Sequence, residues 1–470
     1  MSAGLLLAAL AGWAALLDVH ALPYAREDAA CFVADANGRG GGDLYVIDGD
    51  RITVYPEGTP SGAWSVPLEP GVSAVDVGDL DGDGLPELVA VRGEQILRHP
   101  LDPALGGASE VLFTLATRLS APSPRAFPFV LVVTRDGRPL LALPTEENLE
   151  LRTAAGVVVE SHPIGPDAAQ RVSFGQPFTA LAVEPPRVGP ADSLEIRVSR
   201  SQAYIPELPR DLMPVDPVGP LVRSVPGLQS PTVAAGAVET WPWLPLRTGG
   251  ESPDERVYFA HSPDGDRETL VSVRRAAAPD AGKGRELRLS QPRRYPGFAL
   301  ALGDPAPDFN QDGHTDLVFW NATPPAPTVG AVSRALTGGD WPVRLGAHLF
   351  EPVRGRHTVR PAAMLEAGVP VPWLLDAAGG GAAPLRHLMV ADFNGDGRAD
   401  LGFSPAPDAF WVWMVDVTGA APGAVERFTL PGPAEGLVFR ADLDGQGRTT
   451  VVLRGEGAFY VLRARMTIDK

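Results

Sequence analysis

Two nine-residue stretches decide the fold: Asp392-Phe-Asn-Gly-Asp-Gly-Arg-Ala-Asp400 and Asp308-Phe-Asn-Gln-Asp-Gly-His-Thr-Asp316. A third copy, Asp79-Leu-Asp-Gly-Asp-Gly-Leu-Pro-Glu87, lies upstream. Each copy has oxygen-bearing side chains at positions 1, 3, 5 and 9, and glycine at position 6, where it lets the backbone turn sharply. With the backbone carbonyl at position 7, these groups form the oxygen set that a hard cation such as Ca²⁺ prefers.

The sequence therefore predicts about three structural Ca²⁺ ions, one in each loop. The predicted ligands are the residues at positions 1, 3, 5, 7 and 9: Asp79, Asp81, Asp83, Leu85, Glu87; Asp308, Asn310, Asp312, His314, Asp316; Asp392, Asn394, Asp396, Arg398 and Asp400. Solvated Asp- and Gly-rich turns are the alternative, which repetition of the pattern disfavours.

The loops are not EF-hands. An EF-hand needs a bidentate Glu at position 12, which here is Ala90, Phe319 or Phe403. Each loop instead leads straight into an apolar run and follows a short apolar run such as Val72–Val77. Short apolar runs bounded by Gly and Pro are typical of strands, so the predicted unit is strand, calcium loop, strand.

Two degenerate copies extend the series, at residues 35–43 and 442–450. The first has Arg39 at position 5, and the second has Gln446 and Thr450 at positions 5 and 9. Loop starts are 44 residues apart (35 to 79), 84 apart (308 to 392) and 50 apart (392 to 442). A period of roughly 40–50 residues with several strands per unit indicates the blades of a β-propeller.

At this point the chain resembles a known family. The stretch from Val390 to Phe403, followed by Phe410–Val415, is similar to an FG-GAP/VCBS repeat of the integrin α-chain propeller type. The resemblance implies a ring of blades with Ca²⁺ in the loop between the first two strands of a blade. It also implies settings such as extracellular adhesion and recognition, with ions that stiffen the blades rather than catalyse a reaction.

The predicted fold is all-β, a single β-propeller of four-stranded antiparallel blades over residues 26–470. We expect seven blades, with eight as the alternative, and a last blade closed by N-terminal residues. Residues 125–200 are expected to hold two degenerate units without metal. Residues 201–250 fit no repeat and are predicted to form a Pro- and Trp-rich insertion.

Composition narrows the function. The 52 glycines and 49 prolines of this 470-residue chain suit many short strands joined by turns. A formal charge of −17 argues against a nucleic-acid partner. Cys31 is the single cysteine, so an intrachain disulfide is impossible, and it is expected to be a buried core residue.

The N-terminus carries an apolar run from Gly4 to Leu17. Its length suits a signal peptide, predicted at residues 1–21 with cleavage after Ala21 and, as a weaker choice, after Ala25. A membrane anchor or a mis-assigned start is the alternative. No later run approaches a transmembrane length, so no membrane span is expected after the leader. We expect the protein to be secreted, either extracellular or periplasmic, and associated with the cell envelope. We also expect it to be a monomer.

Two tryptophan pairs and one basic stretch are candidate binding features. Trp241 and Trp243 lie in the predicted insertion, where contact with a ligand and packing are equally expected. Trp411 and Trp413 are two apart on a predicted strand and are expected to pack between blades. Residues 354–360, rich in arginine, are expected to form a solvated loop, with an acidic partner as the alternative.

No His-Glu-x-x-His, Gly-x-Ser-x-Gly or P-loop motif is present, so we predict a protein that is not an enzyme. The leading hypothesis is a calcium-stabilised propeller that binds an extracellular protein or glycan as an adhesion or scaffold module. The alternatives are a carbohydrate-active enzyme, a lyase or hydrolase with a pocket on the ring axis, and a purely structural repeat domain of a surface assembly.

Overall fold

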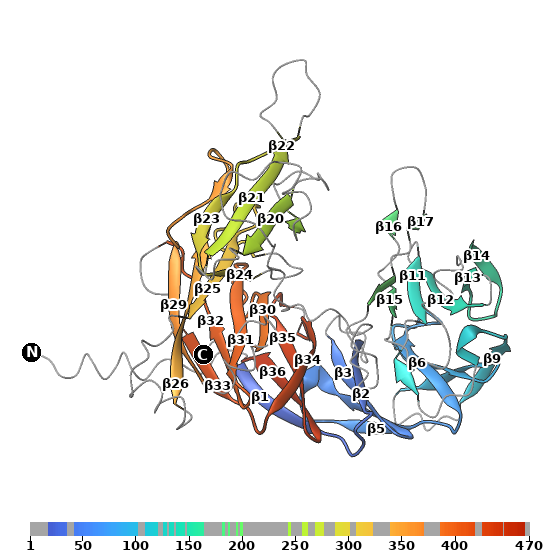
Figure 1. Ribbon diagram of the computed structural model, residues 1–470. Helices are drawn as coiled ribbons and strands as arrows, with labels where there is room; N and C mark the ends of the chain where they lie inside the picture. The colour runs from blue at the N-terminus through green and yellow to red at the C-terminus, as the bar shows by residue number, and fades with distance from the viewer. Residues whose placement is uncertain are drawn as a thin grey trace, which may run out of the picture. The chain divides into compact units, whose positions relative to one another are not determined.

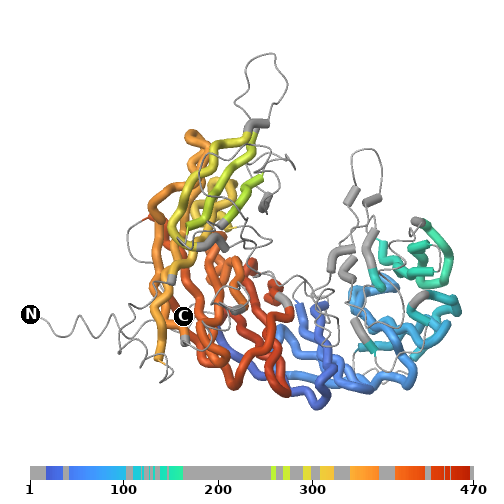
Figure 2. Tube along the Cα trace, in the orientation of Figure 1, coloured from blue at the N-terminus to red at the C-terminus, as the bar shows by residue number. Residues whose placement is uncertain are grey.

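The chain is built from β-strands wherever the computed structural model describes it (Figure 1). The described residues, most of which are drawn in colour in Figure 2, are 17–34, 42–101, 109–120, 126–128, 131–135, 138–145, 148–163, 181–183, 187–188, 194–195, 198–200, 243–245, 256–261, 268–276, 287–300, 307–322, 339–370, 386–418, 425–444 and 446–465. Within these ranges the only helical turns are the 3-10 turns η1 (Pro56–Gly58) and η3 (Arg118–Ser120). None of this structure includes a helix long and apolar enough to cross a membrane.

The chain divides into two compact units, which are described separately. Unit 1 comprises Met1–Leu16 and Val215–Pro433, and unit 2 comprises Leu17–Pro214 and Ala434–Lys470. Unit 2 therefore joins the two ends of the described chain. The loops at residues 79–87 and 442–450 belong to unit 2, and those at 308–316 and 392–400 belong to unit 1.

Unit 2 contains four antiparallel meanders of four strands, one of them extended by a short parallel strand. In sheet order the strands are β1 (Leu17–Pro23), β36 (Ala458–Ala464), β35 (Thr450–Gly455) and β34 (Ala434–Ala441); β2 (Ala30–Ala34), β3 (Asp43–Asp48), β4 (Arg51–Tyr55) and β5 (Trp64–Pro67); β10 (Phe127–Pro128), β6 (Val72–Gly78), β7 (Glu87–Arg92), β8 (Gln95–Pro100) and β9 (Glu110–Thr114); and β11 (Val132–Arg135), β12 (Arg138–Pro144), β13 (Asn148–Arg152) and β14 (Val158–Pro163). Two short pairs follow, β15 (Leu181–Val183) with β18 (Val198–Arg200) and β16 (Arg187–Val188) with β17 (Leu194–Glu195).

Unit 1 contains three larger sheets and one hairpin. In sheet order these are β19 (Trp243–Pro245), β20 (Arg256–His261), β21 (Glu268–Ala276) and β22 (Leu287–Leu289), with β23 (Arg293–Pro296) also paired to β21; β24 (Phe298–Leu300), β25 (Leu317–Ala322), β26 (Asp340–His348) and β29 (Ala363–Pro370); β30 (Arg386–Ala391), β31 (Asp400–Ala406), β32 (Ala409–Trp413) and β33 (Val425–Thr429); and the hairpin β27 (Phe350–Glu351) with β28 (Arg356–His357).

Consecutive sheets within a unit pack face to face. In unit 2, one apolar cluster includes Val461 of β36 and Val46 of β3, and a second includes Tyr45 of β3 and Leu88 of β7. In unit 1, Leu345 of β26 and Phe403 of β31 belong to one cluster. β3 contributes alternate residues to both clusters of unit 2 and is therefore buried on both faces, which explains its continuous apolar sequence.

The sheet of β1, β36, β35 and β34 joins residues from both ends of the chain. β1 pairs with β36 in an antiparallel register from Leu17 opposite Ala464 to Pro23 opposite Ala458 (Figure 1). Leu17 and Leu22 are buried. The predicted pairing of the last strands with N-terminal residues is confirmed, and it covers an edge that would otherwise be exposed.

Several local predictions are confirmed. The described part of the chain is all-β with four-stranded antiparallel sheets, and β20 and β21 form an antiparallel pair. Cys31 is fully buried, and this burial raises the pKa of its thiol. Trp413 is also fully buried, whereas Trp411 is half-buried beneath Arg427, whose guanidinium carbon lies 4.4 Å from the ring centre.

Candidate metal loops and their surroundings

Each acidic loop lies between the first two strands of a sheet. Residues 79–87 join β6 to β7, residues 308–316 lie between β24 and β25, and residues 392–400 join β30 to β31. The degenerate loop at 442–450 joins β34 to β35 in the same way. The predicted strand–loop–strand unit is therefore confirmed.

The aspartate at position 1 accepts backbone N–H groups from its own loop. The N–H at position 6 donates to it in all four loops, over 3.0 Å from Gly84, 3.0 Å from Gly313, 2.7 Å from Gly397 and 2.7 Å from Gly447. These glycines have φ between +78° and +85°, a region that side chains disfavour. The invariant aspartate and glycine thus fix one backbone conformation.

Positions 3, 5 and 7 repeat a second pattern. The N–H at position 5 donates to the side-chain oxygen at position 3, as from Asp396 to Asn394 over 2.8 Å. The N–H at position 7 donates to the acid at position 5, as from Arg398 to Asp396 over 2.8 Å. Equivalent bonds occur in the loops at 79–87 and 308–316, including Leu85 to Asp83 (2.7 Å) and His314 to Asp312 (2.9 Å).

The acid at position 9 is buried and accepts hydrogen bonds from backbone N–H groups. Asp316 accepts the N–H of Phe309 over 2.9 Å with one oxygen and that of Phe350 over 2.8 Å with the other. Asp400 accepts the N–H of Phe393 over 3.1 Å. Burial raises the pKa of both carboxyl groups to about 7, against the lowering effect of these N–H groups.

The donor set of the loops fits a hard cation. Carboxylate and amide oxygens at positions 1, 3 and 5 are accompanied by the carbonyl at position 7, and the loop tips are exposed. When bound, Ca²⁺ would offset the mutual repulsion of these carboxylates. The residues that would hold it are the fifteen predicted ligands; the position-9 acids also tie the backbone together.

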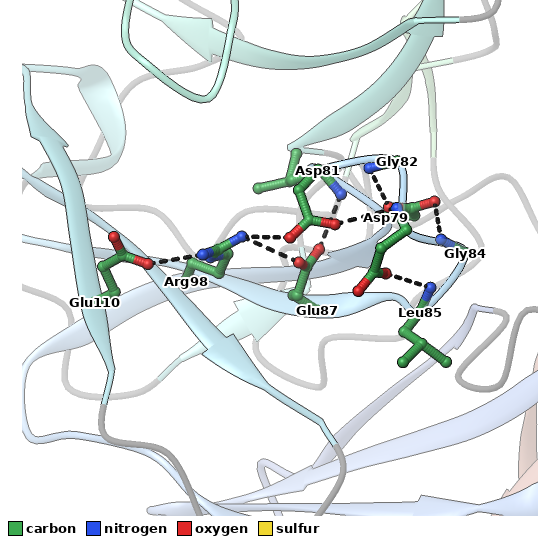
Figure 3. A network of polar contacts seen from close by, with 10 residues as sticks. Asp79, Asp81, Gly82, Gly84, Leu85, Glu87, Arg98 and Glu110 are labelled. Carbon is green, nitrogen blue, oxygen red and sulfur yellow. Dashed lines mark hydrogen bonds and ion pairs between the residues drawn. The ribbon is translucent and has the colours of Figure 1, made fainter. Parts of the chain in front are cut away.

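The loop at 79–87 has an additional feature (Figure 3). One ligand oxygen from each of Asp79, Asp81 and Glu87 lies within 4.8 Å of the others, the one such acidic group found in the described parts of the chain. Arg98 of β8 points into this group. The pattern of the loop alone does not indicate Arg98, because that residue comes from the third strand of the sheet.

The other predicted binding residues lie elsewhere. Trp241 is outside the described residues, and Trp243 lies in β19 opposite Tyr258, with its side chain outside the description. Within the basic stretch, Arg354 is paired with Glu351 over 2.9 Å in the β27–β28 hairpin. A cavity of about 610 Å³ in unit 2 is lined by charges of both signs, including Arg26, Asp48, Asp50, Arg51 and Glu69.

Two buried histidines in unit 1 were not singled out by the sequence. His357 Nε2–H donates to the carbonyl of Thr315 over 2.9 Å, and His348 Nδ1–H donates to that of Thr358 over 2.7 Å. Burial lowers the pKa of both, that of His357 to about 4. Both rings are therefore neutral hydrogen-bond donors in the core.

Acidification is expected to destabilise unit 1 through His357. Its folded pKa lies below the unfolded value, so the unfolded chain takes up the proton first and stability is lost as the pH falls from about 6.5 to about 4. The loss approaches about 3 kcal/mol over this window. Urea unfolding of the wild type and of His357→Gln, which keeps an N–H donor, would measure it: the variant should lose less stability on acidification. Equal losses in both proteins would contradict the assignment.

Among the comparisons with known proteins, only the comparison with solved structures finds a similarity. No protein-family model matches the chain, and no curated protein matches it. The crystal structure of BBS1N in complex with ARL6DN, soaked with mercury, is 11% identical with a TM-score of 0.30, over 97% of this chain and 99% of that chain. The lead-soaked crystal of the same complex is 12% identical with a TM-score of 0.28, over 93% and 92%. The resemblance to FG-GAP/VCBS repeats therefore stays a prediction.

The predicted localisation is corrected. The sequence predicted a secreted, extracellular or periplasmic protein; the solved chains to which this chain is similar are BBS1N in complex with ARL6DN, and the prediction of secretion is withdrawn. The preferred cleavage site, after Ala21, also falls inside β1, and cleavage there would remove five of its seven residues, including the buried Leu17.

Proposed function

We propose that this chain is a calcium-stabilised β-propeller that acts as a protein-binding or scaffold module without chemistry of its own. The observation that carries the proposal is the hydrogen-bond pattern shared by the acidic loops, each between the first two strands of a four-stranded sheet. Seven sheets of four or five strands within the described residues support the proposed seven blades.

The calcium ions have a structural role in this proposal. Each loop gathers carboxylates at the point where two strands meet, so a bound cation would offset their repulsion and hold the strand ends together. A rigid ring is in turn a suitable base for the variable loops that contact a partner.

The perturbed ionisable groups support a binding role over catalysis. Asp76, Asp316, Asp400, His348 and His357 are engaged with backbone groups, so burial and structure account for their altered pKa values. For contact with a protein or glycan ligand we propose Trp241 and Trp243. Replacing each by alanine should weaken that contact without lowering the melting temperature.

Calcium is expected to raise the thermal stability of the purified chain. At free Ca²⁺ ten times Kd, each site adds about 1.4 kcal/mol. Thermal unfolding in EGTA and across a Ca²⁺ titration, with the bound metal counted, measures the effect. Asp396→Ala should remove one ion and its share of the stabilisation, whereas Asp408→Ala, at an exposed turn of the same sheet, should remove neither.

Two outcomes contradict the proposal. If the chain binds no Ca²⁺ and has the same melting temperature in EGTA and in Ca²⁺, its acidic loops are not metal sites. An Asp396→Ala variant with an unchanged ion count means that the ligand assignment at residues 392–400 is wrong.

A further inference from the structure

The four described loops fall into two classes at position 3. Of these four, the two in unit 2 have an aspartate there, Asp81 or Asp444, and the two in unit 1 have an asparagine, Asn310 or Asn394. An aspartate at this position adds a negative charge to a cluster of acids. Such a charge needs a positive partner nearby.

In the loop at 79–87 the positive partner is Arg98. Its Nη1 lies 2.8 Å from Asp81 Oδ2 and 3.3 Å from Glu87 Oε1 (Figure 3). Its Nη2 lies 2.8 Å from Glu110 Oε2 on β9, directly opposite in the sheet. The guanidinium, with its side chain 28% exposed, thus contacts two acids of the loop and is anchored from behind by a third acid.

The convergence of Asp79, Asp81 and Glu87 is explained by this arginine. Two of the three carboxylates contact the same guanidinium nitrogen. An ion that bound Asp81 Oδ2 and Glu87 Oε1 at 2.3–2.6 Å, the usual range for Ca²⁺, would need the place that this nitrogen occupies. Arg98 and Ca²⁺ therefore compete for the same oxygens.

The loop at 442–450 repeats the arrangement with a different arginine. Arg448, at position 7, places Nη2 2.5 Å from Oδ2 of Asp444, and the two side chains are 17% and 8% exposed. This loop lacks acids at positions 5 and 9, where Gln446 and Thr450 stand. The same position-3 aspartate is thus balanced from within the loop.

No arginine pairs with an acid of the asparagine loops in the contacts of the described residues, although His314 Nδ1 lies 3.0 Å from Asp312 Oδ1 in the loop at 308–316. Arg398 occupies position 7, as Arg448 does, but position 3 of its loop is the neutral Asn394, which offers no carboxylate for an ion pair. Asn310 and Asn394 donate instead to the acids at position 5, over 2.9 and 3.2 Å. Among the described residues, no arginine contacts the acidic oxygens of these two loops.

We propose that Arg98 and Arg448 are built-in counterions that take the place of a bound cation, so that Ca²⁺ binds at 308–316 and 392–400 and is excluded from 79–87 by Arg98. This inference rests on the proposed calcium function and changes its stoichiometry from about three ions to two, both in unit 1. It also means that the side chain of Arg98 alone determines whether the loop at 79–87 binds Ca²⁺.

Counting bound Ca²⁺ on the full chain by equilibrium dialysis tests the proposal. The wild type should bind two ions and Arg98→Gln three. Arg448→Gln should still bind two, because its loop lacks two acidic ligands. Arg344→Gln, which breaks an exposed pair with Glu366 outside any loop, should also bind two. Adding Asp83→Ala to Arg98→Gln should return the count to two, which assigns the third ion to this loop.

A second variant keeps the test sharp if Arg98→Gln does not fold. Asp83→Ala in the wild type changes an exposed loop residue. It should leave the count at two if Arg98 excludes the ion, whereas a fall in the count overturns the proposal. A wild type with three ions also overturns it, as does an Arg98→Gln variant that folds and gains none.

The failure of the proposed function has a different signature. If the wild type binds no Ca²⁺ but Arg98→Gln binds one, the calcium function of unit 1 is wrong and the role of Arg98 stands. If neither protein binds any, both proposals fall.

Discussion

Replacing Arg454 by methionine is expected to lower the free energy of unfolding by about 3–5 kcal/mol. Arg454 lies in β35, and its side chain is almost wholly buried. Its Nη1 donates to the carbonyl of Ala29 over 2.9 Å, and its Nη2 donates to that of Glu27. Its guanidinium carbon lies 4.8 Å from the ring centre of Tyr24.

The large effect follows from what remains when the guanidinium is removed. Methionine fills much of the volume but donates no hydrogen bond, so two carbonyl groups of the segment between β1 and β2 lose a charged donor. The cation–π contact with Tyr24 is lost at the same time. Because this segment is more than 420 residues from Arg454 along the chain, the variant loosens the link between the two ends of unit 2.

Urea unfolding of the wild type, Arg454→Met and Arg344→Met measures the effect. Arg344 pairs with Glu366 at an exposed position, so its replacement should cost less than about 1 kcal/mol. An Arg454→Met protein as stable as the Arg344→Met control would contradict the proposed link.

The sheets could be predicted because their signals are local. Each acidic loop lies within nine residues, and the strands on either side are short apolar runs that adjoin it. Repetition then indicated the period. The burial of Trp413 and Cys31 was likewise predictable, because cysteine and tryptophan are among the residues that are most often buried in folded proteins.

The role of residues 17–23 could not be predicted in the same way. Leu17 ends the apolar run that suits a leader, and the sequence around residues 17–23 gives no reason to expect a strand. The partner, β36, is more than 430 residues away, and the register in which Leu22 faces Phe459 is fixed by tertiary packing. A local pattern contains no information about such a pairing.

The acidic loops of the candidate site could be predicted from the sequence, but the arginines that pair with their carboxylates could not. Arg98 lies eleven residues beyond Glu87, and it reaches the loop because it stands on the third strand of the same sheet. Arg448 lies within the degenerate loop at residues 442–450, but its pairing with Asp444 depends on the direction of its side chain, which the sequence does not give. The one signal in the sequence that could have indicated an arginine partner was the choice of aspartate or asparagine at position 3 of the loop.

The role of the half-buried Asp76 could not be predicted either, because one aspartate in a strand resembles any polar residue on a solvated face. Asp76 lies in β6, where Oδ2 accepts the N–H groups of Leu131 and Val132 over 2.7 and 2.8 Å. Its Oδ1 accepts the N–H of Val77 over 2.8 Å. The side chain thus ties β6 to the start of β11 in the next sheet, and burial raises its pKa to about 7.

Asp76→Ala is therefore expected to destabilise the protein by about 3–5 kcal/mol. Alanine leaves three backbone N–H groups without their acceptor, and the two at Leu131 and Val132 are in a packed region between sheets, where water is a poor replacement. Asp50→Ala, at an exposed position of the same unit, is the matched control and should change stability by less than about 0.5 kcal/mol. Hydrogen exchange gives the local readout: the amides of Leu131 and Val132 should exchange faster in Asp76→Ala, while amides of β31 in unit 1 should not. If those two amides stay protected and the variant is as stable as the control, Asp76 does not hold β11 to β6, and packing around Leu131 alone joins the two sheets.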